Sequence, residues 1–361
     1  MIIFKYLSLN CYPMKKLLIT GGVGFLGYHI CKKLSKKFDE IILVDIDTFN
    51  PIEYDKNVSY FRVDVTDKDG LRRVIQEKKP NFIIHTAAAL PLCKKERIWK
   101  VNLKGMKNIL ELALENKVER VTQISSTAVY GVPKIHPLYE KSPLIGVGPY
   151  GKTKIISEKI CEAYRKKGLC VPIIRPKTFI GTGRLGVFQI LYDWIENGSR
   201  IPIIGNGKNR YQLLEVEDLV DAIYLTLTKD KEKANDTFNV GATSFNTVYE
   251  DVSALCKYAN SGSKVLKTPA LPIKIILSVL EFMRLSPLYK WVYGTADKDS
   301  FVSVEKIRKV LGWSPKYSNA QALINSYKWY LDNKSSMASG TGVTHRIAWK
   351  QGALGIFKKI L

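Results

Sequence analysis

The sequence predicts an α/β protein with a doubly wound parallel sheet and a smaller C-terminal lobe. Short β-rich runs alternate with amphipathic helical stretches from Lys15 onward, and strands separated by helix-length connections usually run parallel. The first of these runs leads directly into a glycine-rich turn that opens a helix. In such sheets, ligands bind beyond the carboxyl ends of the strands, where the strand order reverses.

The pattern predicts each element of the sheet domain in turn. Strands are expected at 16–20, 40–45, 59–64, 82–87, 120–126 and 171–176. The helices between them are expected at 28–37, 68–77, 101–116 and 152–167. This alternation is typical of a sheet with helices on both faces.

The same sequence pattern divides the chain into four segments. We expect an N-terminal extension at 1–13, a sheet domain at 14–176 with a later contribution from about 214–240, a lobe mainly at 177–333, and a linker with a basic amphipathic tail at 334–361. The extension has only a short apolar stretch and no small-residue cleavage site, so it does not match a secretory signal. Translation starting at Met14 fits the pattern better.

Composition excludes several classes of protein. The 361 residues are 46% hydrophobic and 11% aromatic, which is too apolar for a disordered chain. The net charge of +23 comes from dispersed lysines and arginines without a nucleic-acid motif, and favours an anionic ligand or membrane surface instead. The six cysteines lack disulfide or zinc spacing. We therefore expect a cytoplasmic protein without a metal site or a nucleic-acid partner.

The glycine turn predicts a dinucleotide site. Gly21, Gly24 and Gly27 lie where a strand meets a helix, and such glycines let backbone N–H groups approach a pyrophosphate. Phe25 and Leu26 lie in the same turn. Asp45 ends the second strand and is placed to accept both hydroxyls of an adenosine ribose. Because a carboxylate repels a 2′-phosphate, NAD is favoured over NADP.

Three further residues are candidates for the cofactor site. Asp64 and Val65 end the third strand and are placed to contact the adenine, although an Asp there also suits a turn before a helix. Ala87 ends the fourth strand and leaves room for a dinucleotide, but it equally suits close helix–sheet packing. His85 lies in an apolar strand and is expected to be a core residue.

Tyr150 and Lys154 are candidates for proton transfer. They are four residues apart and share one face of a helix. A free tyrosine titrates near ~10, and a neighbouring ammonium favours its phenolate. The fifth strand ends in ISSTAVYG, which brings the hydroxyls of Ser125, Ser126 and Thr127 to the same edge. One of these hydroxyls can hold a reacting oxygen while Tyr150 takes its proton.

Together these motifs resemble the extended short-chain dehydrogenases/reductases of the NAD-dependent epimerase/dehydratase type. The resemblance spans about Met14 to Asn333 and rests on TGGVGFLG, VD, DV, HTAA, VN, SSTAVYG, YGKTK and RPKTFIG in the family's order. It implies a Rossmann-type sheet, NAD as cofactor, and Ser126, Tyr150 and Lys154 as the catalytic triad. It also implies that the backbone of Pro176 lies beside the nicotinamide and that the protein forms a homodimer.

The resemblance also limits which of the family's reactions this chain is expected to catalyse. Dehydratases of the family carry Asp-Glu after the catalytic hydroxyl, whereas this chain has Thr127 and Ala128. Ser126, Thr127 and Arg210 are expected to bind substrate, with Arg210 at the family's position for a nucleotide diphosphate. A nucleotide-sugar epimerase acting at C4 of a UDP-hexose is the first hypothesis. The alternatives are a dehydrogenase resembling those for 3β-hydroxysteroids, acting on an apolar alcohol, and a non-catalytic NAD(H)-binding regulator.

The C-terminal tail leaves two interpretations open. Its apolar residues recur at helical spacing among lysines and an arginine, a pattern that can lie on a membrane surface. Docking on the parent domain or on a partner subunit explains the same pattern. No stretch of the chain has the ~20 uninterrupted apolar residues that a membrane span needs.

Overall fold

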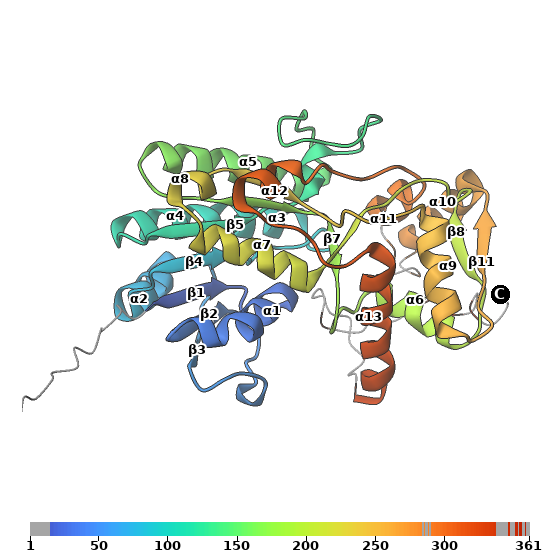
Figure 1. Cartoon of the computed structure of the whole chain (residues 1–361), viewed down its shortest axis with the longest axis horizontal. Coiled ribbons are helices and arrows are strands. Elements are labelled where there is room, and N and C mark those ends of the chain that lie inside the picture. Colours follow the sequence, from blue (N-terminus) through green and yellow to red (C-terminus); the bar gives the residue numbers. More distant parts are fainter. Residues whose placement is uncertain are drawn as a thin grey trace, which may run out of the picture.

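The computed structural model describes residues 15–283, 285, 288, 290–336, 346, 351–352, 354–355 and 358. The predicted N-terminal extension and Met14 therefore lie outside the described residues. The described chain has two parts, a parallel sheet with helices on both faces and a smaller lobe beside one end of that sheet (Figure 1).

The central sheet has seven strands in the order β10-β6-β5-β4-β1-β2-β3, and every pair is parallel. Their bounds are β1 (Lys16–Thr20), β2 (Glu40–Asp45), β3 (Val58–Arg62), β4 (Phe82–His85), β5 (Arg120–Ile124), β6 (Ile173–Pro176) and β10 (Thr237–Val240). The chain builds outward from β1 to β3 and then returns to place β4 on the other side of β1. The strand order thus reverses between β1 and β4, and a ligand crevice is expected beyond their carboxyl ends.

Both faces of the sheet are covered by helices. Leu17 and Ile19 pack on the face covered by α1 (Phe25–Leu34) and α7 (Val216–Thr228). Leu18 packs on the opposite face, which is covered by α2 (Lys68–Lys78), α4 (Met106–Glu115) and α5 (Gly148–Lys166). Because neighbouring side chains of a strand point to opposite faces, an uninterrupted apolar strand such as KLLIT fills both cores. The Rossmann-type α/β prediction is confirmed.

Short elements connect these strands and helices. They are η1 (Ser35–Lys37), η2 (Pro51–Glu53), α3 (Lys95–Trp99), the π-helical turn η3 (Lys100–Gly105), η4 (Thr127–Tyr130), α8 (Lys231–Ala234) and α12 (Glu305–Leu311).

The predicted element bounds differ from the structure mainly at the edge that faces the lobe. The strands predicted at 16–20 and 40–45 coincide with β1 and β2. The strands predicted at 82–87 and 120–126 end at His85 and Ile124, because the chain leaves the sheet there to line a cavity. The helix predicted at 152–167 already begins at Gly148, since Pro149 is compatible with a first helical turn.

The C-terminal lobe contains two small sheets and several helices. Its strands are β7 (Thr178–Ile180), β8 (Ile201–Ile204), β9 (Leu213–Glu215) and β11 (Val265–Thr268), which pair as β7-β9 and β8-β11. Its helices are α6 (Val187–Glu196), α9 (Val248–Ala259), α10 (Ala270–Phe282), α11 (Lys290–Thr295) and α13 (Asn319–Asn333), followed by η5 (Lys334–Ser336). Side chains of α6, α9 and α13 share one core. None of the helices in the described part of the chain combines the length and hydropathy needed to cross a membrane.

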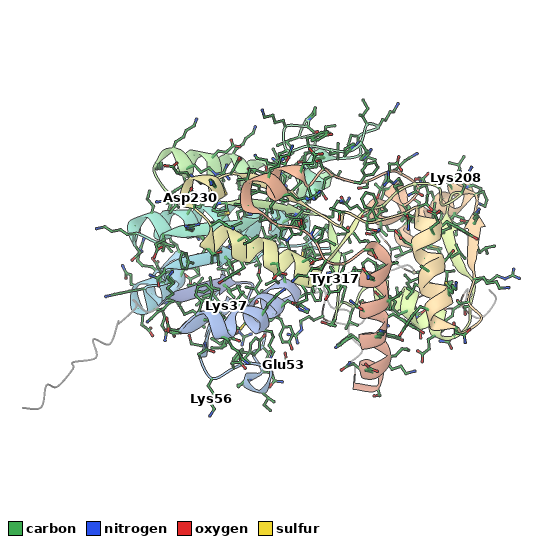
Figure 2. The ribbon with its side chains drawn as sticks, viewed as in Figure 1. Lys37, Glu53, Lys56, Lys208, Asp230 and Tyr317 are labelled. Carbon is green, nitrogen blue, oxygen red and sulfur yellow. The ribbon has the colours of Figure 1, made fainter. Side chains whose placement is uncertain are left out.

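The described residues of the C-terminal tail contact the protein itself. Arg346 forms an ion pair of 2.6 Å with Glu53, which lies at the edge of the sheet domain (Figure 2). Gln351 donates a hydrogen bond to Asp193 of α6, and Lys358 pairs with the same carboxylate at 2.6 Å. These contacts favour docking on the parent domains, one of the two interpretations that the sequence left open.

Candidate active site

A cavity of about 890 Å³ lies beyond the carboxyl ends of the central strands, between the sheet and the C-terminal lobe. Its lining comes from the ends of β1, β2, β4, β5 and β6 and from segments of the lobe as far along as α13. The predicted residues that line it are Gly21, Gly24, Phe25, Leu26, Asp45, Asp64, Val65, Ala87, Ser126, Thr127, Tyr150, Lys154 and Pro176. The fold therefore brings the two separate predicted clusters, the glycine turn and the hydroxyl–tyrosine–lysine set, to one cavity.

The glycine turn depends on close backbone packing. Gly21 has a φ of +68°, and a Cβ there would lie 2.7 Å from Oγ1 of Thr86. A Cβ on Gly27 would collide with the carbonyl oxygen of Gly21. Gly27 is absent from the cavity lining, so its role in this structure is to let α1 pack against the turn. Gly24 is the N-cap of α1 without a side-chain cap, so the first N–H groups of the helix are available to an anion.

Asp45 is held in place by backbone N–H groups. Val23 donates to one carboxylate oxygen at 3.1 Å, and Ile46 and Asp47 donate to the other at 2.7 and 3.2 Å. Burial raises the pKa of Asp45, and these hydrogen bonds act against that rise. The carboxylate thus lies fixed at the cavity, in the position expected to receive a ribose.

Asp64 and Val65 have separate roles in the loop after β3. Asp64 accepts a hydrogen bond of 2.8 Å from the backbone N–H of Thr66, which supports the turn role that the sequence left open, and it also lines the cavity. The carbonyl oxygen of Val65 accepts a hydrogen bond from the buried Asn108. Ala87 follows β4 and lies against the glycine turn, so its small side chain serves both packing and access.

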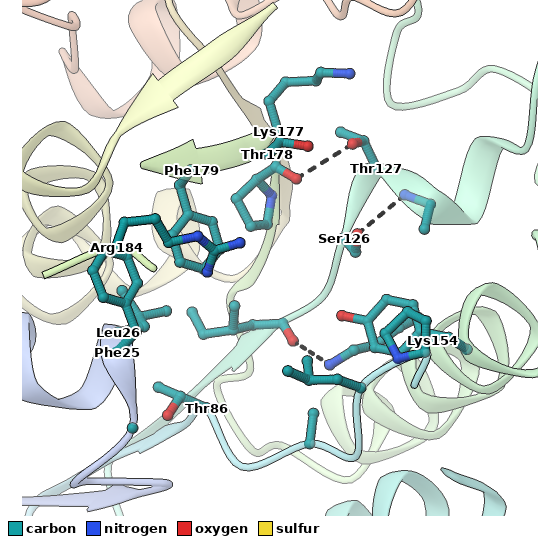
Figure 3. A pocket seen from close by; sticks show the side chains of 18 of the residues that line it. Phe25, Leu26, Thr86, Ser126, Thr127, Lys154, Lys177, Thr178, Phe179 and Arg184 are labelled. Carbon is teal, nitrogen blue, oxygen red and sulfur yellow. Dashed lines mark hydrogen bonds between the residues drawn. The ribbon is translucent and has the colours of Figure 1, made fainter. Parts of the chain in front are cut away.

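Lys154 is buried directly beneath the reacting edge. Its Nζ atom donates a 2.7 Å hydrogen bond to the carbonyl oxygen of Ile124, the last residue of β5, and lies 5.7 Å from the ring centroid of Tyr150 (Figure 3). Burial lowers the pKa of Lys154 to about 8, while the carboxylate of Glu158 acts against that shift. An ammonium beside a phenol favours the ionised form of the phenol.

Ser126 and Thr127 lie across the cavity edge from Lys154. Ser126 is the N-cap of η4, and its Oγ atom accepts a 3.1 Å hydrogen bond from the N–H of Ala128. Thr127 donates a 3.3 Å hydrogen bond to the carbonyl oxygen of Pro176 (Figure 3). The strands β5 and β6 thus deliver a hydroxyl and a fixed backbone segment to the same place.

A buried polar network that the sequence did not suggest supports this arrangement. Arg175 of β6 pairs with Glu158 of α5 at 2.6 Å, and Ser125 donates a hydrogen bond to the same carboxylate. Arg175 also donates to the hydroxyl of Tyr130 at 2.8 Å. The side chain of Asn102 bonds both the N–H and the carbonyl oxygen of Ala89, and it donates a 3.0 Å hydrogen bond to Oγ1 of Thr153 on α5. These contacts fix α5, which carries Tyr150 and Lys154, against the sheet.

Arg210 lies apart from this cavity lining. Its guanidinium is 4.7 and 4.9 Å from the ring centroids of Phe245 and Phe301. Lys177 and Arg184 do line the cavity, as does Arg97. Arg184 lies 5.3 Å from the ring centroid of Phe25. No local spacing in the sequence distinguishes these cations from the many surface lysines and arginines.

The described chain also shows where the histidine of β4, possible metal ligands and the cysteines lie. His85 is buried and shares a 2.7 Å hydrogen bond with Thr20, and burial lowers its pKa to about 3, as suits a core histidine. Across the described residues, no group of three or more His, Cys, Asp or Glu side chains is arranged to hold a metal ion. The five described cysteines are free thiols.

A glycine turn, a carboxylate held by backbone N–H groups and a tyrosine–lysine pair around one cavity are typical of a dinucleotide-dependent enzyme. The profile of the NAD dependent epimerase/dehydratase family matches residues 17–241. Since this is more than half of the chain, the chain belongs to that family. The predicted resemblance to extended short-chain dehydrogenases/reductases is confirmed, and the protein is an enzyme of the isomerase or oxidoreductase class with NAD as its cofactor.

Two relatives and one solved structure are similar to this chain over most of its length. An uncharacterized protein of Sinorhizobium fredii is 33% identical over 95% of this chain and 85% of its own length. The UDP-glucose 4-epimerase of Lactobacillus helveticus is 27% identical over 87% of this chain and 97% of its own. Among solved structures, the UDP-glucose 4-epimerase of Thermotoga maritima with UDP-glucose superposes with a TM-score of 0.74 at 23% identity, covering 88% of this chain and 99% of that one.

Proposed function

We propose that this protein is a nucleotide-sugar 4-epimerase that uses Ser126, Tyr150 and Lys154 for proton transfer. The observation that carries the proposal is that these three residues line the same cavity as Gly21 and Asp45. A substrate hydroxyl and a dinucleotide can therefore meet within one cavity. Similarity to UDP-glucose 4-epimerases supports a UDP-hexose as the substrate.

The chain's own residues have distinct tasks in such a reaction. NAD, when bound, supplies a hydride acceptor that later returns the hydride. Tyr150 removes the proton of the substrate hydroxyl as the carbon–hydrogen bond breaks and a ketone forms. Lys154 stabilises the phenolate of Tyr150 by its positive charge, and Ser126 hydrogen-bonds the reacting oxygen. With the ketone turned so that its opposite face is toward the cofactor site, Tyr150 would give the proton back to the same oxygen, and the inverted alcohol would form.

The residues after Ser126 favour epimerisation over dehydration. Thr127 is engaged with the carbonyl oxygen of Pro176, and Ala128 has no side-chain acid. Neither residue can deliver the second proton that loss of water from a neighbouring carbon requires. The described structure thus supports the prediction that this chain is not a 4,6-dehydratase.

The proposal is tested by incubating the NAD-loaded protein with UDP-glucose or UDP-galactose. Interconversion of the two sugars without net NADH formation supports the epimerase. Conversion that yields stoichiometric NADH, or no conversion of any UDP-hexose, would contradict it.

A dehydrogenase of apolar alcohols is the second candidate, and one observation favours it. The helix α10 leaves large apolar side chains exposed, with Leu271 at 71% and Phe282 at 90% exposure. The adjoining α11 supplies Val292 to the cavity. Net NADH formation from a sterol that is insensitive to UDP would select this function instead. The homodimer, the cytoplasmic location and the membrane contact of the tail stay predictions.

A further inference from the structure

Lys177 is a buried cation that the proton-transfer mechanism does not use. It directly follows Pro176 at the end of β6, lines the cavity, and is only 3% exposed. Its Nζ atom donates a 2.6 Å hydrogen bond to Oγ of Ser300 and lies 4.8 Å from the ring centroid of Tyr211. Ser300 and Tyr211 line the same cavity.

No acid in the described part of the chain compensates the charge of Lys177. It forms no ion pair with a described carboxylate, and burial alone lowers its pKa to about 7. Its Nζ atom contacts a hydroxyl and an aromatic face, and its charge also acts on His136, which is no counter-ion. Burying an ammonium without a counter-ion is costly. Because the group faces a ligand cavity, an anionic group of the ligand is a suitable counter-ion.

The position of Lys177 indicates which part of the ligand carries that anion. Thr127 donates its hydrogen bond to the carbonyl oxygen of Pro176, the residue before Lys177, so Lys177 lies next to the reacting edge. Figure 3 shows Arg184 beside Phe25 and Leu26 at the start of α1, whereas Lys177 lies on the side of Thr127. Lys177 therefore lies on the side of the cavity that holds Thr127, where the sugar of the substrate is expected, and Arg184 lies nearer the glycine turn.

We propose that Lys177 is a specificity-determining residue that binds a carboxylate on the sugar of the substrate, so that the preferred substrates are nucleotide-linked acidic sugars. The ammonium donates a hydrogen bond to the carboxylate, either instead of its bond to Ser300 or in addition to it. This inference rests on the proposed function, from which it takes the nucleotide-sugar class of substrate. It adds that the sugar carries a negative charge. The net charge of +23 also favours such anionic substrates.

Calorimetric titration of the NAD-loaded protein with UDP, UDP-glucose and UDP-glucuronate separates the possible roles. The wild type is expected to bind UDP-glucuronate about 10- to 100-fold more tightly than UDP-glucose, the range for a hydrogen bond to a charged group. In Lys177→Met this preference disappears while the affinity for UDP stays the same. Lys177→Arg is expected to keep part of the preference.

A matched control is Lys208→Met. Lys208 is exposed on the outer side of the C-terminal lobe (Figure 2), and the preference should survive its replacement. Ser300→Ala removes only the neutral partner of Lys177 and should leave the preference intact. Thermal unfolding of each variant shows whether it is folded before titration.

Three results would overturn the proposal. The first is a wild type that does not prefer the acidic sugar. The second is an equal loss of affinity for all three ligands in Lys177→Met, which would show that the cation binds the diphosphate or supports folding. The third is an unchanged preference in that variant. Because calorimetry compares affinities whether or not the bound sugar is epimerised, failure of the epimerase assay alone contradicts the proposed function and leaves this comparison valid.

Discussion

Arg175 and Glu158 form a buried ion pair, with 2.6 Å between Nη2 and Oε2, that joins the end of β6 to the middle of α5. Both side chains are nearly inaccessible, at 5% and 3% exposure. The pair lies one turn beyond Lys154 on α5 and one residue before Pro176 on β6. It therefore positions the two segments that carry the proton-transfer residues and the backbone beside Thr127.

Replacing one partner of this pair is expected to destabilise the fold. Glu158→Gln leaves the guanidinium of Arg175 buried without a counter-ion, which costs about 3–5 kcal/mol. Chemical denaturation measures the change in the free energy of unfolding. The double variant Glu158→Gln, Arg175→Met removes both charges and should recover part of the loss. Equal stability of the wild type and Glu158→Gln would show that the pair is unimportant.

Activity is expected to fall as the pH rises through about 8. Burial lowers the pKa of Lys154 to about 8, so the ammonium is present below that pH and is lost above it. Loss of the positive charge removes the stabilisation of the Tyr150 phenolate. This fall is measured on the alkaline side of the pH dependence of kcat. Lys154→Arg keeps its charge at all these pH values, so whatever activity it retains should show no fall near pH 8.

Gly27→Ala is expected to weaken NAD binding about 5- to 150-fold, because overpacking of this size costs about 1–3 kcal/mol. The added Cβ would collide with the carbonyl oxygen of Gly21 and push α1 away from the turn. Fluorescence titration with NADH measures the affinity. Gly294→Ala is the control, since a Cβ there meets no atom within 4 Å. The same affinity in both variants would contradict the packing role of Gly27.

Removal of residues 335–361 distinguishes the two interpretations of the tail. Arg346 and Lys358 pair with Glu53 and Asp193 at 2.6 Å each, so the truncated protein should melt at a lower temperature. Cosedimentation with anionic vesicles is the second measurement. Equal vesicle binding by both forms agrees with docking on the protein, whereas loss of binding on truncation together with an unchanged melting temperature assigns the tail to the membrane.

The parts of the site that the sequence predicted are those with a local pattern. Gly21, Gly24 and Gly27 mark a strand-to-helix turn, and Tyr150 and Lys154 share a helix face because they are four residues apart. Parallel strands bring their carboxyl ends to one edge, and this explains why the two separate clusters line one cavity. The alternation of strands and helices was sufficient to predict the fold class.

The remaining parts depend on tertiary contacts that have no local signal. Arg175 and Glu158 are 17 positions apart, and nothing in their spacing indicates an ion pair. Lys177 and Arg210 look equally like surface cations in a lysine-rich chain. Folding buries Lys177 beside the cavity and places Arg210 against two phenylalanine rings that contact each other. The predicted substrate contact of Arg210 therefore stays a prediction, while Lys177 and Arg184 emerged only from the structure.

Turnover of UDP-hexoses by Tyr150→Phe tests the central claim most directly. The phenylalanine keeps the ring but removes the group that accepts and returns the proton, so the rate of interconversion should fall by about 10²- to 10⁴-fold with NAD binding retained. A Tyr150→Phe variant that interconverts UDP-glucose and UDP-galactose at the wild-type rate would contradict the proposed mechanism.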